Sequence, residues 1–207
     1  MTTKTTTTKK TTTTKSSVPK KTATKLPPVV NETLPANPFA FEVLALAAKQ
    51  RSNAKKVEIL QKYEHPSIKA LFIWNFDESV ISVLPQGEVP YSSAQEQTSY
   101  SGTLSEKIED AVGKMSELNS RSLGATDQGR SSIRKEYSKF YNFVKGGNDT
   151  LPSLRRETMF INILEGLHPL EAEILCLVKD KKLETKYKIS KEIVSQAYPD
   201  IQWGGRS

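Results

Sequence analysis

The chain has 207 residues, 36% of them hydrophobic, and its mean hydropathy of −0.50 lies on the polar side of globular proteins. No apolar run approaches the roughly 18 residues that a membrane-spanning helix needs, and we expect no secretory signal, because no apolar segment follows the first residues. A single cysteine, Cys176, excludes an internal disulfide and a cysteine-based zinc site, and favours a reducing environment.

The formal charge of +7 is concentrated at one end of the chain. Residues 1–25 contain seven lysines and no acidic residue, and the other 23 basic residues equal the 23 acidic ones in number. The body is therefore formally neutral. The N-terminal segment is either a cationic arm that binds nucleic acid or a solubilising tether. The candidate phosphate-binding residues are Lys4, Lys9, Lys10, Lys15, Lys20, Lys21 and Lys25.

Residues 1–36 are rich in threonine, lysine and proline. Threonine is a poor helix former and proline removes a backbone donor, so with little apolar surface this arm is predicted to be disordered. A first helix is then predicted from "ANPFAFEVLALAAKQR" (36–51), with Asn37 as N-cap and Pro38 in the first turn. A second starts near Ser52, and a third follows His65, a possible cap.

The third helix has an alternative, because Leu71–Trp74 is rich in β-formers and "SVISVL" could pair with it as a hairpin within residues 66–84. We favour a helix that ends in a packed loop. Residues 85–102 are typical of a linker or long surface loop. A helix with the capping box Thr103–Glu106 then opens at residue 103.

The last third has the clearest helical pattern. One helix is predicted from residue 131, stopped by Gly146 and Gly147, with an apolar face of Ile133, Tyr137, Phe140, Tyr141 and Val144. A second, with Leu154 on its apolar face, stops at Gly166, and a third begins at His168-Pro169. Ser190 caps a final short helix. The predicted fold is all-α, a small bundle of six to eight helices with a disordered basic N-terminal arm.

The predicted organisation is an arm (1–36), an N-terminal helical part (37–91), a linker or insertion with one helix (92–127) and a C-terminal helical part (128–207). Residues 37–207 are compatible with a single domain. "EILQKYEHPSIKALFI" and "NILEGLHPLEAEILCL" share an Ile-Leu pair followed by His-Pro, which two helix hairpins would explain. We interpret this echo as repeated helix-start chemistry.

The chain offers little for catalysis. His168 and Glu171 are spaced for two metal ligands on one helical turn, but no third ligand is evident, and both histidines fit helix caps better. Cys176 lies between two leucines, which favours a buried, unreactive thiol. "VKGGNDT" (144–150) lacks the order of a phosphate-binding loop and fits a helix stop. We expect no enzyme, no metal and no cofactor.

Two surfaces could bind a partner. In the last third of the chain, tyrosines lie among basic residues that include Arg134, Arg155 and Arg156. We favour a solvated basic face as the explanation of this pattern over a binding site for single-stranded nucleic acid. The terminal "QWGGRS" carries Trp203 and Arg206, two residue types that anchor interfaces. This tail is either a docking peptide or a segment whose Trp203 packs back on the last helix.

Residues 39–91 and 140–207, and most specifically "MFINILEGLHPLEAEILCLVKDKKL", resemble a family of uncharacterised proteins encoded by T-even-like tailed phages, chiefly myoviruses of cyanobacteria. The Thr/Lys arm and residues 92–127 lie outside this resemblance and are interpreted as additions peculiar to this chain. The resemblance implies a viral origin and action in the infected cell or the virion. It implies no activity, cofactor or catalytic residue.

These observations predict a non-enzymatic binding or adaptor protein. Its body would dock on a host or phage protein in the host cytoplasm, and its arm would add nonspecific attraction to nucleic acid. A virion structural or assembly component is the first alternative, and a small enzyme with an unrecognised site is the second. No membrane partner is expected, and the oligomeric state is left open.

Overall fold

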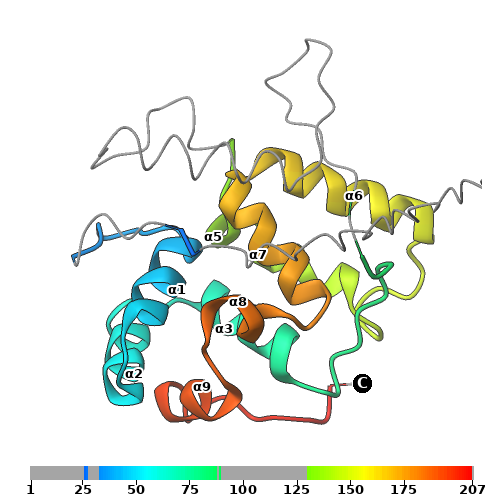
Figure 1. Cartoon of the computed structure of the whole chain (residues 1–207). Coiled ribbons are helices and arrows are strands. Elements are labelled where there is room, and N and C mark those ends of the chain that lie inside the picture. The colour runs from blue at the N-terminus through cyan, green and yellow to red at the C-terminus, as the bar shows by residue number, and fades with distance from the viewer. Residues whose placement is uncertain (1–25, 28–32, 88, 90–129, 207) are drawn as a thin grey trace, which may run out of the picture.

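All regular structure is helical in the residues that the computed structural model describes, which are 26–27, 33–87, 89 and 130–206 (Figure 1). These residues form α1 (Ala40–Lys49), α2 (Asn53–Lys62), α3 (Pro66–Phe76), α5 (Ile133–Glu136), the 3₁₀ helix η1 (Tyr137–Phe143), α6 (Ser153–Gly166), α7 (Pro169–Lys179), α8 (Leu183–Tyr187) and α9 (Lys191–Ala197). The predicted all-α bundle is confirmed. Residues 1–25 of the predicted arm and the helix expected at residue 103 lie outside the described residues.

Helix α7 is the centre of the bundle and packs against α1, α3, α6 and α8 (Figure 1). Its sequence explains this position, because apolar residues occur on every side of the helix and not on one stripe. Its fully buried apolar residues are Leu170, Ala172, Ile174, Leu175 and Val178. Burying a leucine, isoleucine or valine side chain stabilises a fold by about 1.5–3 kcal/mol, so α7 contributes much of the core.

Helix α2 packs against both α1 and α9, the first and the last helix of the described residues. Two long-range hydrogen bonds fix α9 there. The Tyr198 hydroxyl donates to the Leu60 carbonyl oxygen at 2.7 Å, and Gln61 Nε2 donates to the Ala197 carbonyl oxygen at 3.3 Å. The N-terminal and C-terminal helical parts therefore share one hydrophobic core.

The two His-Pro sequences start helices in the same way. His65 Nδ1 accepts a hydrogen bond from the Ser67 amide at 3.1 Å, and His168 Nδ1 accepts one from the Leu170 amide at 3.1 Å. The predicted caps are confirmed. The packing is not repeated, because α6 lies on α7 whereas α2 lies on α1 and α9. Two equivalent helix hairpins are therefore absent from the described residues, and the echo is one of helix-start chemistry.

Helix α1 begins later than predicted. Its N-cap is Phe39, and Glu42 Oε2 accepts from the Phe39 amide at 2.8 Å. The expected cap at Asn37 was wrong because the Pro38 carbonyl oxygen accepts a hydrogen bond from Arg134 Nε at 2.9 Å instead of joining the helix.

Residues 66–84 form a helix that ends in a loop, as favoured, and the hairpin alternative was wrong. The loop instead makes an isolated antiparallel bridge, Ser82 to Val144, with a segment 62 positions further along the chain. The Val83 amide donates to the Phe143 carbonyl oxygen at 3.0 Å, and the Lys145 amide donates to the Ile81 carbonyl oxygen at 2.9 Å. This bridge ties the loop after α3 to the end of η1.

The prediction of one continuous α-helix from residue 131 was wrong, because most of this segment is a 3₁₀ helix. After one α-helical turn the chain continues as η1, which has three residues per turn. Phe140 and Phe143 are therefore buried together, while Tyr141, expected inside, is 54% exposed. Leu154, also expected on an apolar face, is 75% exposed because it lies in the first turn of α6, where residues 152–155 all lie at the surface.

The helix stop predicted at Gly146 and Gly147 was wrong in its place, because η1 ends at Phe143 with the extended residue Val144 as C-cap, and the two glycines lie in the turn that follows. Gly146 has φ +79°, a conformation that costs other residues energy. A Cβ on Gly147 would lie 1.9 Å from the Tyr141 carbonyl oxygen, so only glycine fits this close approach.

Helix α8 was not predicted. It has five residues, and it ends at Lys188, whose φ of +54° is the left-handed conformation that a glycine normally supplies. Its start is fixed by tertiary contact, because the Leu183 amide donates to Asn75 Oδ1 of α3 at 3.1 Å.

Candidate functional site

The C-terminal tail is anchored by one buried carboxylate, Asp77 at the end of α3. Asp77 Oδ1 accepts from the amide and the hydroxyl of Ser79 at 2.9 and 2.7 Å. Asp77 Oδ2 accepts from the Gly204 amide at 3.0 Å and from an Arg206 guanidinium nitrogen at 2.5 Å. Burial alone would raise the pKa of Asp77, but these hydrogen bonds outweigh it and lower the pKa to about 2. Asp77 is therefore charged at neutral pH and holds Arg206.

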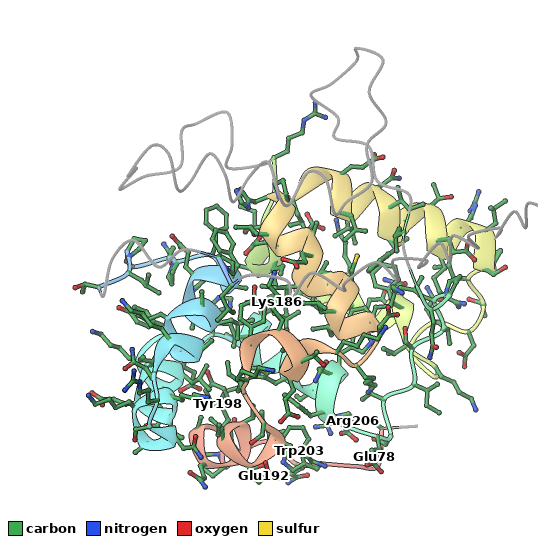
Figure 2. The ribbon with its side chains drawn as sticks, viewed as in Figure 1. Glu78, Lys186, Glu192, Tyr198, Trp203 and Arg206 are labelled. Atoms are coloured by element: carbon green, nitrogen blue, oxygen red, sulfur yellow. The ribbon has the colours of Figure 1, made fainter. Side chains whose placement is uncertain are left out.

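Trp203 packs back on the last helix (Figure 2). Its Nε1 donates to Ser195 Oγ at 3.0 Å, and Lys191 Nζ lies 5.0 Å from the centroid of its ring. Arg206 is at the surface, with its guanidinium on Asp77. Of the two interpretations of the tail, the contacts of Trp203 favour the segment that packs on the body. A docking role for Trp203 and Arg206 stays a prediction.

A pocket of about 310 Å³, here called the Trp74 pocket, opens between α3, η1 and the tail. Its charged lining residues are Lys145 and Arg206, and none of its lining residues is acidic. Trp74 is 2% exposed, and its Nε1 has no hydrogen-bond partner among the described residues. The lining residues are Ala70, Ile73, Trp74, Val80, Phe140, Tyr141, Val144, Lys145, Gly146, Gly147 and Arg206.

A second, larger hollow of about 560 Å³ lies along α6, facing α5 and η1. Its rim carries Glu136, which accepts from Lys139 Nζ at 2.6 Å and from Ser131 Oγ at 2.5 Å. Leu154 lines it as well, and Arg155 adds a further positive charge. The charged groups of this hollow are largely satisfied by each other.

His168 and Glu171 do not form a metal site. Glu171 Oε1 accepts from the Ala40 amide of α1 at 2.9 Å, and Oε2 accepts from the Ile133 amide of α5 at 2.8 Å. His168 caps its own helix and stacks on Phe41 at 5.0 Å between ring centroids. The described residues contain no cluster of three or more histidine, cysteine or acidic side chains that could hold a metal.

Glu171 thus caps the N-termini of two other helices, and sequence reasoning missed this role. The sequence shows only an acidic residue in the first turn of α7, where it also complements the helix dipole. Both partners are more than 35 positions away, so no local pattern identifies them.

The titration of Glu171 should make stability depend on pH. Burial raises the pKa of Glu171 from 4.5 to about 7, although the amides of Ala40 and Ile133 oppose the rise. Because the folded pKa lies above the unfolded one, this contribution to stability is complete below about pH 4.5 and is lost as pH rises through about 7. When the pH is raised from 5 to 8, the free energy of unfolding of the native chain should fall by about 1–3 kcal/mol more than that of the Glu171→Gln variant. The glutamine of this variant does not titrate.

Urea denaturation of both proteins at the two pH values measures this difference. Glu173, whose pKa burial also raises, is present in both proteins and cancels in the comparison. The charge of Glu42 helps to raise the pKa of Glu171, so this effect is part of the measured difference. An equal pH dependence in the native chain and in Glu171→Gln would contradict the prediction.

Other reactive or basic side chains of the last third serve the structure. Burial raises the pKa of the Cys176 thiol to about 12, so it stays protonated at neutral pH. Arg156, expected on a solvated basic face, is instead buried, with Nε donating to the Asn142 carbonyl oxygen and a terminal nitrogen donating to that of Asn148, each at 2.8 Å. It therefore organises the glycine-rich segment 144–150 from inside.

A buried ion pair joins α7 to α8. Lys186 Nζ donates to Glu173 Oε1, and both side chains are less than 10% exposed. Neither residue lines the Trp74 pocket or the hollow along α6. The ion pair therefore has a structural role, because it links α7 to α8.

The seven arm lysines, Lys4 to Lys25, lie outside the described residues. The end of the arm that is described contacts the body, where Leu26 and Leu34 pack on the core and the Leu34 amide donates to the Tyr63 hydroxyl at 3.0 Å. Within the described part of the chain, no helix is long and apolar enough to cross a membrane.

The described residues thus form an all-α structure with a pocket at Trp74, a hollow along α6 and no assembled catalytic or metal centre among them. A family of unknown function, DUF6433, matches residues 43–115 and 117–185, more than half of the chain. The chain belongs to this family. No curated protein and no solved structure matches the chain.

The family match corrects one expectation. It includes most of residues 92–127, so this segment belongs to the region that the family shares and is not an addition peculiar to this chain. The Thr/Lys arm remains outside the match.

Proposed function

We propose that this protein is a non-enzymatic binding or adaptor protein of a tailed phage that acts in the cytoplasm of the infected cell. Its helical body would dock on a host or phage protein, and its arm would attract nucleic acid without sequence preference. The separation of charge supports the proposal most directly, because seven lysines precede a body with equal numbers of basic and acidic residues.

The contacts of the buried ionisable groups support a role without catalysis. Glu171 and Asp77 each accept hydrogen bonds on both oxygens, and Lys186 is paired with Glu173. Catalytic acids and bases need to reach a substrate, whereas Glu171, Asp77 and Lys186 are occupied by the fold.

The arm is tested by changing its seven lysines to glutamine in the full chain. We expect this variant to lose most of its affinity for a 30-base-pair duplex in a gel-shift or anisotropy assay. For the native chain, a plot of the logarithm of the binding constant against the logarithm of the salt concentration should have a negative slope of magnitude up to about 6. Each phosphate that a lysine neutralises contributes about −0.9 to this slope, and the arm has seven lysines. The full chain is required because Leu26 and Leu34, in the last part of the arm, contact the core.

A matched control changes seven exposed lysines of the body to glutamine, which gives both variants a formal charge of zero. The control positions are Lys49, Lys55, Lys62, Lys135, Lys139, Lys182 and Lys188. Equal losses in the two variants would show that the arm is not the binding element and only contributes to net charge.

A virion structural or assembly component is the alternative role. Quantitative mass spectrometry of purified virions separates the two, since an adaptor that acts in the cell would be missing from particles or present far below stoichiometric copy number.

A further inference from the structure

The Trp74 pocket has the shape and lining of a small binding site. Its volume of about 310 Å³ is at the lower end of ligand pockets, large enough for one or two apolar side chains. Its walls are mainly apolar or aromatic and come from three chain segments, α3, η1 with the residues that follow it, and the tail. The bridge from Ser82 to Val144 and the bond from Asp77 to Arg206 hold these segments together.

A buried donor in the wall of this pocket lacks a partner. Trp74 packs on Phe140 at 5.4 Å and on Phe143 at 6.1 Å between ring centroids, which fixes its ring. Its indole N–H finds no acceptor among the described residues, although it is fully buried. An unsatisfied buried donor costs about 1–3 kcal/mol, and buried tryptophans usually avoid this cost. This nitrogen is closed to solvent, so an occupant of the pocket would contact the indole ring and not the N–H.

The rim of the pocket favours an anionic, amphipathic ligand. Lys145 is exposed, no described group pairs with it, and Arg206 adds a second cation whose charge Asp77 partly offsets. Tyr141, 54% exposed, lines the rim, and Ile81, 47% exposed, is hydrogen-bonded through its carbonyl to the Lys145 amide. Exposed aromatic and apolar side chains beside arginine are typical of protein interfaces.

We propose that the Trp74 pocket binds a short acidic segment of a partner protein. One large apolar side chain of that segment fills the pocket and packs against the Trp74 ring, and a neighbouring carboxylate faces Lys145. This inference rests on the proposed binding function and specifies its docking site. It uses Arg206, whose side chain is held at the rim by Asp77.

The first test is a selection of random 12-residue peptides on the immobilised full chain. We expect enriched peptides with one phenylalanine, leucine or tryptophan next to acidic residues. Affinity of the best peptide is then measured by fluorescence anisotropy. Ala70→Trp, which fills the pocket from a half-buried position, should weaken binding at least about tenfold, and Lys145→Glu about fivefold or more.

Matched controls are available elsewhere on the surface. Thr158→Trp adds the same bulk to the hollow along α6, and Lys55→Glu makes the same charge change on α2. Both positions are exposed, and both variants should bind the peptide within about twofold of the native chain. Circular dichroism and urea denaturation of all four variants show that each is folded.

A direct readout follows the indole proton of Trp74 by ¹H–¹⁵N correlation spectroscopy. The chain has two tryptophans, so Trp203→Phe assigns the Trp74 signal. Saturation with the selected peptide should move this signal, because the side chain that fills the pocket packs against the Trp74 ring, and Ala70→Trp should abolish the shift.

Two outcomes would overturn the proposal. One is a selection that enriches no peptide. The other is an enriched peptide whose affinity is the same in Ala70→Trp and whose binding leaves the Trp74 signal unmoved. In the second case the chain still binds a protein segment, so the binding function stands while this pocket is not its site.

Discussion

Replacing Glu171 with alanine should lower the free energy of unfolding by about 2–5 kcal/mol, because the change leaves two buried amides without an acceptor. Ala40 opens α1 and Ile133 opens α5, and the first amides of a helix have no partner within it. Both amides lie in the core, where water cannot easily replace the carboxylate. The loss should therefore exceed that of an ordinary helix cap.

Urea denaturation followed by circular dichroism measures this loss. Glu171→Gln keeps one acceptor oxygen and should fall between the native chain and Glu171→Ala. Glu58→Ala, at an exposed position of α2, is the matched control and should change stability by less than about 0.5 kcal/mol. A loss below about 1 kcal/mol in Glu171→Ala would show that α1 and α5 start equally well without this carboxylate.

Phe143→Ala should cost about 3–5 kcal/mol, whereas Tyr141→Ala should cost less than about 0.5 kcal/mol. Phe143 is fully buried and meets Phe160 edge-on at 5.2 Å between ring centroids, so its removal leaves a cavity in the core. Tyr141 is more than half exposed. The two positions thus test the 3₁₀ register directly.

Thermal or urea unfolding of both variants gives the comparison. In a continuous α-helix that starts at Ile133 with its apolar face as first predicted, Tyr141 would be inside and the order of the two effects would reverse. Equal losses at the two positions would contradict both registers.

The sequence predicts those parts of the fold whose signals are local. The histidine caps of α3 and α7, for example, need only the next two residues. The 3₁₀ period of η1 could not be predicted in the same way. It depends on the pairing of Phe143 and Lys145 with the loop after α3, a contact between segments about 60 positions apart.

The candidate site shows the same division. Arg206 was identified as an interface residue type, but its place at a pocket depends on Asp77, which lies more than 120 positions earlier. Trp74 stands in an apolar run and is indistinguishable there from a core residue. Only the folded chain shows that its ring lines a pocket.

The anchoring of Gly204 and Arg206 on Asp77 also decides where any following residues emerge. Arg206 lines the Trp74 pocket, so an affinity tag or fluorescent protein fused after it would begin at the mouth of that pocket. Such a fusion would crowd the pocket and could mask a partner in a capture experiment.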